Sequence, residues 1–209
     1  MPLEAPLYPV NLVVAGRACL VVGGGTVARR KVEGLLAGEA VVTVVAPAID
    51  AGTRALAGVR CLDRPYQAGE VAGYRLAIAA TNDPAVNRAV FADGEAAGVW
   101  VNAADDPVAC SFTLPSIVRR GPLLATFSTG GRSPALSSWL ARRMGEMLGP
   151  EYETLVDLLA GERATLQAAG RPTGGPGWQK ALDSDMLALI RSGQLTQAKE
   201  RLQACLSSS

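Results

Sequence analysis

The sequence predicts an α/β protein. A Rossmann-like, doubly wound parallel sheet comes first, then a small α+β segment and a C-terminal helical domain. Three observations predict it. Short apolar runs alternate with helical patterns over the first half of the chain, a glycine-rich turn follows the first run, and this rhythm changes after Pro107. Alternating strands and helices are typical of a mostly parallel sheet with right-handed crossovers.

The opening strand, helix and strand follow from the residue pattern. Residues 18–22 (ACLVV) form a short apolar run that stops at three glycines. A helical pattern covers about 27–37, with Gly38 as its stop signal, and residues 41–45 (VVTVV) predict the second strand. A strand, a helix and a strand within about 30 residues have the size of a βαβ unit.

The remaining strands of the sheet are predicted further along. A short helix at 49–57 and a strand at 59–62 come next, and residues 75–80 (RLAIAA) and 99–103 (VWVNA) are buried strands. Between the last two, Asp83 as N-cap and Pro84 at the first position predict a helix that ends near Ala97.

After Pro107 the pattern predicts a hairpin of two strands, 111–118 and 122–128, joined at Arg119-Arg120-Gly121. Ser133-Pro134 begins a helix that ends near Leu148. The remainder is predicted to be helical, over 151–169, 178–192 and 196–206. We therefore expect three parts, a dinucleotide-binding domain at 1–112, a middle segment at 113–149 and a helical domain at 150–209.

Composition excludes several functions. The 209 residues contain no histidine, which rules out Ser-His-Asp and Cys-His catalysis and His-ligated zinc. The four cysteines form no CxxC pair, so neither a zinc ribbon nor a dithiol redox motif is expected, and we expect no stable protein metal site. The net charge of +1 indicates no global attraction to nucleic acid or membranes. Without a signal peptide or an apolar run of about 18 residues, a soluble cytoplasmic protein is expected.

The glycine-rich turn is the first candidate binding site. Gly23-Gly24-Gly25-Thr26-Val27-Ala28 matches GxGxxA between a strand and a helix. Gly23 would make the tight turn, Gly25 would let the backbone approach a pyrophosphate, and the helix N-terminus would face the anion. The alternative is a glycine-rich turn without a ligand.

The second strand ends without the usual acid that binds a ribose hydroxyl. Val45-Ala46-Pro47 stands there, so NAD would be held by backbone groups of Ala46–Ala48. No arginine stands at that strand end for a 2′-phosphate, which favours NAD over NADP, although Arg29 and Arg30 begin the first helix. Those two arginines are either cofactor contacts or solvated helix residues.

Polar residues follow two later strands, where ligands lie in doubly wound sheets. Thr81 and Asn82 would face the nicotinamide, or else serve only to cap a helix. Asn102 lies near the end of the fifth predicted strand and Asp105 follows that strand, and Asp105 is the candidate general base. Its alternative role is that of a turn residue before Pro107.

From Pro107 to Gly145 the chain has no Asp or Glu but five arginines. Arginine pairs well with carboxylates, and the Ser128–Gly131 turn before a helix is a second potential anion site. The stretch therefore predicts a polyanionic substrate or, alternatively, a basic solvated face. The candidate substrate-binding residues are Asn102, Arg119, Arg120, Ser128, Thr129, Gly130 and Arg132.

Taken in order, several stretches resemble the precorrin-2 dehydrogenase family, which includes the N-terminal region of siroheme synthase. They are CLVVGGGTVARRKVEGLL, VTVVAP, LAIAATNDPAVNRAV, VNAADDP, SFTLPSIVRRGPLLATFSTGGRSPALSSWLARRM and the N-terminal YPVNL. The resemblance covers about residues 5–150. It implies NAD-dependent oxidation of precorrin-2 to sirohydrochlorin, in some members ferrous iron insertion, and a homodimer formed through residues 113–145.

The resemblance also assigns residues. It implies that Asp105 is the essential aspartate and that Thr26-Val27 and Pro47-Ala48 contact NAD. Thr129 stands where some members carry a serine, so the resemblance does not decide whether a serine-specific role, such as phosphorylation, applies to this chain. Precorrin-2 carries eight carboxylates, which suits an arginine-rich stretch without acids. Two other readings stay open, a non-catalytic NAD-sensing module and a chelatase without dehydrogenase activity.

Overall fold

The computed structural model describes residues 6–104 and 106–207. The chain forms two compact units. The first comprises residues 6–114 with the short segment 130–133, and the second comprises residues 115–129 with 134–207. The predicted division into three parts stays a prediction.

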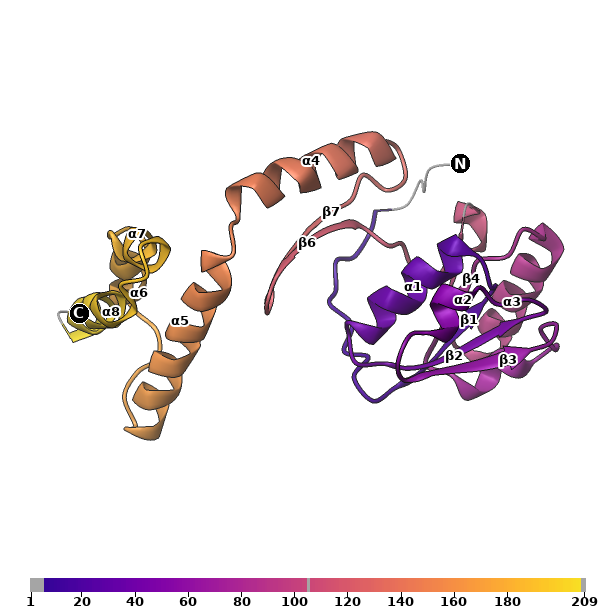
Figure 1. Ribbon diagram of the computed structural model, residues 1–209, viewed down its shortest axis with the longest axis horizontal. Coiled ribbons are helices and arrows are strands. Elements are labelled where there is room, and N and C mark those ends of the chain that lie inside the picture. Colours follow the sequence, from indigo (N-terminus) through magenta and orange to yellow (C-terminus); the bar gives the residue numbers. More distant parts are fainter. Residues whose placement is uncertain (1–5, 105, 208–209) are drawn as a thin grey trace. The chain divides into compact units, whose positions relative to one another are not determined.

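The first unit contains a five-stranded parallel sheet in the order β3-β2-β1-β4-β5 (Figure 1). Its strands are β1 (Ala18–Val22), β2 (Val41–Ala46), β3 (Val59–Asp63), β4 (Leu76–Ala79) and β5 (Trp100–Ala103). The connections contain α1 (Thr26–Leu36), α2 (Ala51–Arg54), the 3₁₀ turn η1 (Glu70–Gly73) and α3 (Pro84–Ala97). A further 3₁₀ turn, η2 (Pro107–Ala109), follows β5. The chain leaves β1 toward β2 and β3 and then returns across β1 to β4, so the strand order changes direction beside β1.

Both faces of the sheet are buried, which explains the unbroken apolar runs of its strands. Successive side chains of a strand point to opposite faces. In β1, Cys19 and Val21 therefore join the core that includes Val32 of α1, whereas Leu20 and Val22 join the core that includes Val90 of α3. The two cores fix β1 at the centre, and with it the glycine turn at its carboxyl end.

Of two predicted helix-end residues, Asp83 at the start of α3 has its predicted role, and Gly38 after α1 does not. Asp83 caps α3 as predicted, because its Oδ1 accepts a hydrogen bond of 2.8 Å from the N–H of Ala85. Gly38, the predicted stop of α1, does not take the left-handed conformation. Ala37 caps that helix, and Glu39 has a φ of 60°. Glu39 therefore makes the reversal that Gly38 was expected to make.

The second unit begins with the hairpin of β6 (Ser116–Arg120) and β7 (Leu123–Phe127), against which α4 (Pro134–Met147) packs (Figure 1). It continues with α5 (Glu151–Ala168), α6 (Pro176–Leu182), α7 (Met186–Arg191) and α8 (Leu195–Ser207). A separate apolar core unites these last four helices and includes Leu155, Ala181, Met186 and Leu202.

Two predictions about the second unit need correction. The hairpin turn is Gly121-Pro122, and Arg119 and Arg120 belong to β6, because a two-residue loop with Gly121 at φ 53° suffices to reverse the chain. Residues 111–115 are not part of β6. The N–H of Ser111 donates to Val101 O, which ties the start of this segment to β5.

The helix predicted over 178–192 is two helices, α6 and α7. Between them the Ser184 hydroxyl donates to Ala181 O and accepts from the N–H of Met186. Serine and aspartate compete in this way with helical hydrogen bonds, which is why Asp183-Ser184-Asp185 interrupts the helix.

Candidate dinucleotide-binding site

A cavity of about 960 Å³ lies at the carboxyl ends of β1, β2 and β4. Ligands of doubly wound sheets bind at this edge, where the strand order changes direction. The cavity brings together all the predicted cofactor-binding residues, namely Gly23, Gly24, Gly25, Thr26, Val27, Ala46, Pro47, Ala48, Thr81 and Asn82. Their contact with a cofactor stays a prediction.

Two of the three glycines are required by the fold itself. Gly23 has a φ of 132°, and a Cβ there would overlap the carbonyl oxygen of Ala80. A Cβ at Gly24 would overlap the carbonyl oxygen of Ala48. Hydrogen bonds hold the same approach, from Gly23 N to Val45 O and from Asp50 N to Gly24 O, each 2.9 Å long. The glycine turn and the segment after β2 therefore pack closely against each other on one side of the cavity.

Gly25 differs from its neighbours, because a Cβ there would meet nothing within 4 Å. Gly25 is the N-cap of α1, no side chain among the described residues caps this helix, and its first turn carries no acidic residue. The first N–H groups of a helix have no partners within it and carry partial positive charge. Open space in front of an uncapped helix N-terminus fits the pyrophosphate of a dinucleotide.

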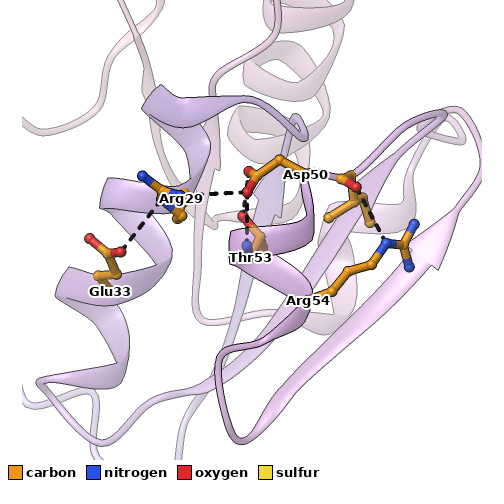
Figure 2. A network of polar contacts seen from close by, with 6 residues as sticks. Arg29, Glu33, Asp50, Thr53 and Arg54 are labelled. Carbon is orange, nitrogen blue, oxygen red and sulfur yellow. Dashed lines mark hydrogen bonds and ion pairs between the residues drawn. The ribbon is translucent and has the colours of Figure 1, made fainter.

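The segment after β2 is held by a polar network (Figure 2). The Asp50 carboxylate accepts from the N–H of Thr53 (2.9 Å) and from its hydroxyl (2.7 Å), and the guanidinium of Arg29 lies 3.8 Å away. These hydrogen bonds from Thr53, aided by the charge of Arg29, lower the pKa of the Asp50 carboxyl. Arg29 also pairs with Glu33 of α1 at 3.6 Å, so its charge links α1 to the start of α2.

The segment after β4 serves the cavity and the fold together. The Thr81 hydroxyl donates to Asn87 Oδ1 at 2.8 Å, and Asn87 Nδ2 donates back to Thr81 O at 3.1 Å. Asn87 is only 6% exposed, and the sequence interpretation did not select it. Thr81 therefore lines the cavity while its hydroxyl stabilises the turn into α3, and its contact with the nicotinamide stays a prediction.

The segment after β5 is tied on both sides of Asp105, which itself lies outside the described residues. The N–H of Ala104 donates to Ala79 O at 2.7 Å, and the Cys110 thiol lies 3.2 Å from Asp106 O. Burial raises the pKa of this thiol, so the thiol keeps its proton and acts as a donor. Asn102 is 9% exposed and donates to Phe112 O at 2.9 Å, so its amide holds the backbone here.

The other predicted substrate residues are divided between the two units and do not line the cavity. Arg119, Arg120, Ser128 and Thr129 belong to the second unit, whereas Gly130 and Arg132 belong to the first. All the donor nitrogens of Arg120 are engaged, with Nε on Leu148 O (2.6 Å), Nη2 on Gly145 O (2.8 Å) and Nη1 on Arg119 O (2.9 Å). Arg120 therefore satisfies carbonyls at the C-terminus of α4.

The sequence interpretation missed one wall of the cavity. Pro65, Tyr66 and Ala68 line it from the segment after β3, and Ala85, Val86 and Ala89 line it from α3. A tyrosine shortly after a predicted strand was the available signal, but it carries no motif.

Across 6–104 and 106–207, no helix is both long and apolar enough to cross a membrane. In the same ranges, no three Asp, Glu or Cys side chains gather where they could hold a metal ion.

The fold and the cavity are those of a dinucleotide-binding protein, and the comparison with protein families agrees. Residues 10–116 match a family described as "Putative NAD(P)-binding". This match spans half of the chain, and the chain belongs to that family.

Relatives narrow this assignment. The siroheme synthase of Nitrosococcus oceani is 36% identical over 205 residues, which are 95% of this chain and 43% of that protein. That of Pseudomonas putida strain F1 is 40% identical over 155 residues, or 73% of this chain and 34% of that protein. The chain thus spans less than half the length of these relatives. The solved structure of SirC, a precorrin-2 dehydrogenase, superposes with a TM-score of 0.68 at 27% identity and covers 96% of this chain and 100% of its own. The chain is a homologue of SirC and of the N-terminal region of siroheme synthases.

Proposed function

We propose that this chain uses NAD to oxidise precorrin-2 to sirohydrochlorin, the dehydrogenase step of siroheme biosynthesis. One observation carries the proposal. The cavity at the point where the strand order reverses is lined by every predicted NAD-binding residue, in a chain homologous to SirC over nearly its whole length. The substrate is proposed because SirC is a precorrin-2 dehydrogenase.

Different residues of the cavity would bind different parts of the dinucleotide. The N–H groups at the start of α1 would bind the pyrophosphate, and Gly25 leaves room for it. The close contact of Gly24 with Ala48 would hold the backbone of Ala46–Ala48 against the adenosine ribose. NAD, when bound, accepts a hydride.

Asp105 is our candidate for the general base. Oxidation of precorrin-2 removes one hydride and one proton, and the products are sirohydrochlorin, NADH and a proton. Asp105 would accept that proton from the substrate and release it to solvent. The hydrogen bonds of Ala104 and Cys110 would keep the neighbouring backbone in place. Arginines of the acid-free stretch, Arg119 and Arg132 among them, would pair with substrate carboxylates.

The test is anaerobic turnover of precorrin-2 with NAD, following NADH and the sirohydrochlorin spectrum together. We expect equal amounts of both products. Replacing a general base costs about 100-fold or more, so Asp105→Asn should lose turnover to that extent while it still binds NADH. Asp106→Asn is the matched control and should keep turnover. NADH binding without turnover in the unaltered protein would contradict the proposal and favour an NAD-sensing module or a chelatase.

Two further points belong to the proposal and have direct tests. Ferrous iron added to the sirohydrochlorin formed in the same assay tests for siroheme formation, with iron as a substrate. Light scattering of the purified chain tests the expected homodimer, for which a mass of twice 21.6 kDa is expected. A cytoplasmic location is part of the same proposal.

A further inference from the structure

The wall of the cavity after β3 is apolar and carries an aromatic ring. Pro65, Tyr66 and Ala68 form it, together with Ala85, Val86 and Ala89 on the facing turns of α3. The body of Tyr66 packs against the same apolar core as Val86 and Val90. An apolar wall that includes an aromatic ring suits a flat aromatic ligand group.

Tyr66 is fixed by a residue of α3. Its hydroxyl donates to Asp93 Oδ2 at 2.8 Å, and the N–H of Gly69 donates to the same oxygen at 2.7 Å. Burial and the charge of Asp93 both raise the pKa of Tyr66, so the hydroxyl stays protonated and keeps donating. One carboxylate therefore holds two points of the segment that carries the ring.

A second carboxylate holds the same segment from its other end. Glu70 accepts from Arg64 Nη1 at 3.0 Å and from the N–H of Gln67 at 3.1 Å. The side chain of Glu70 is 12% exposed and that of Arg64 is 34% exposed, so the carboxylate is the better shielded partner of the pair. Residues 64–70 are thus held in place by the protein itself, without the help of a ligand.

The strand order decides which half of a dinucleotide meets this wall. The pyrophosphate belongs at the glycine turn after β1, so the two nucleosides extend toward β2–β3 and toward β4–β5. The hydride acceptor must lie near the candidate base that follows β5. The adenosine is therefore left with the β2–β3 side, and the segment that follows β3 brings Tyr66 into the lining of the cavity.

We propose that Tyr66 provides the surface on which the adenine ring of the dinucleotide stacks, and that Asp93 is the positioning residue that orients Tyr66. This inference rests on the proposed function, because it requires a dinucleotide in the cavity. It deepens that proposal by naming the residue that recognises the half of the cofactor remote from the chemistry.

The experiment measures the Kd of NADH by its fluorescence. ADP-ribose, which contains adenine, and nicotinamide mononucleotide, which lacks it, serve as competitors. Tyr66→Ala should weaken NADH and ADP-ribose about tenfold, a loss typical of one base–aromatic stack, and leave nicotinamide mononucleotide unchanged. Tyr66→Phe keeps the ring and should bind ADP-ribose nearly as the unaltered protein does. The matched control is Tyr74→Ala, which alters the same core outside the cavity lining and should leave all three affinities unchanged.

The role of Asp93 is tested by comparing Asp93→Ala with the conservative variant Asp93→Asn. Asp93→Ala should weaken ADP-ribose severalfold without changing nicotinamide mononucleotide. Asp93→Asn keeps an oxygen that can accept from Tyr66 and should restore most of the loss. A merely structural role would shift both competitors together.

The outcomes separate the two proposals. Absence of NADH binding in the unaltered protein overturns the proposed function and this inference with it. NADH binding with unchanged ADP-ribose affinity in Tyr66→Ala overturns the inference alone. Equal losses in Tyr66→Ala and Tyr74→Ala, or a parallel loss of nicotinamide mononucleotide, overturn it too. If Tyr66→Ala does not fold, Tyr66→Leu, which keeps an apolar side chain and removes only the flat ring, answers the same question.

Discussion

The glycine turn between β1 and α1 and the arginine-rich stretch from Pro107 to Gly145 are the two regions where the sequence predicts ligand contacts. In the glycine turn, the predicted residues line one cavity, and the packing itself requires Gly23 and Gly24. In the arginine-rich stretch, Arg120 donates to three backbone carbonyls of its own unit. The difference teaches that a motif acting through its backbone can be located from the sequence. A guanidinium, by contrast, donates to backbone carbonyls as readily as to carboxylates, so its partner does not follow from the sequence.

The largest effect is expected at Gly24. Gly24→Ala would force a methyl group into the Ala48 carbonyl, and overpacking of this kind costs about 3 kcal/mol of unfolding free energy. Gly25→Ala meets open space and should cost no more than about 1 kcal/mol, because alanine is only a poorer N-cap. Chemical denaturation measures both values.

NADH binding tests whether Gly25 has a different role from Gly23 and Gly24. Gly25→Ala should weaken NADH about tenfold or more, equivalent to roughly 1.4 kcal/mol, while the protein stays folded. Such a result would separate the ligand-facing glycine from the two that the fold requires. A Gly24→Ala protein as stable as the unaltered chain would show that the close contact with Ala48 is not needed.

Arg120 tests the other region. Arg120→Ala removes charged hydrogen bonds to the end of α4 and should destabilise the second unit by about 2 kcal/mol. Arg119→Ala is the matched control, at the neighbouring position of β6, and should leave stability nearly unchanged. If Arg120→Ala keeps its stability and instead raises the KM for precorrin-2, the arginine is a substrate contact and the comparison fails.

The smallest effect concerns an ion pair beside the cavity. The hydrogen bond from Arg64 lowers the pKa of Glu70, so this group stabilises the fold above its unfolded pKa, near 4.5. Glu70→Gln should therefore cost about 1 kcal/mol at pH 7. The difference between the two proteins should shrink as the pH falls below about 4.5 and Glu70 takes up its proton. Denaturation at pH 7 and at successively lower pH checks this, and a constant difference would exclude the ion pair as its source.

Local patterns predicted the first unit well. The strands at 18–22, 41–45 and 59–62 and the capped start of α3 are confirmed, because alternation, apolar runs and caps act over a few residues. The errors lie where a local signal competes with another contact. Glu39, and not Gly38, takes the left-handed backbone conformation after α1. Ser184 divides a helix that periodicity alone would continue.

By itself, the sequence determined the alternating fold, the glycine turn and ten of the residues that line one cavity. The glycine turn could be located because only glycine fits beside the Ala48 and Ala80 carbonyls. Only the tertiary structure decided the partners of Tyr66 and Arg120. Tyr66 meets Asp93 across 27 positions of the chain, and Arg120 meets Leu148 across 28. The partners of such side chains could not be predicted, because no short-range pattern links residues so far apart in the sequence. Only the folded chain brings them within hydrogen-bond distance.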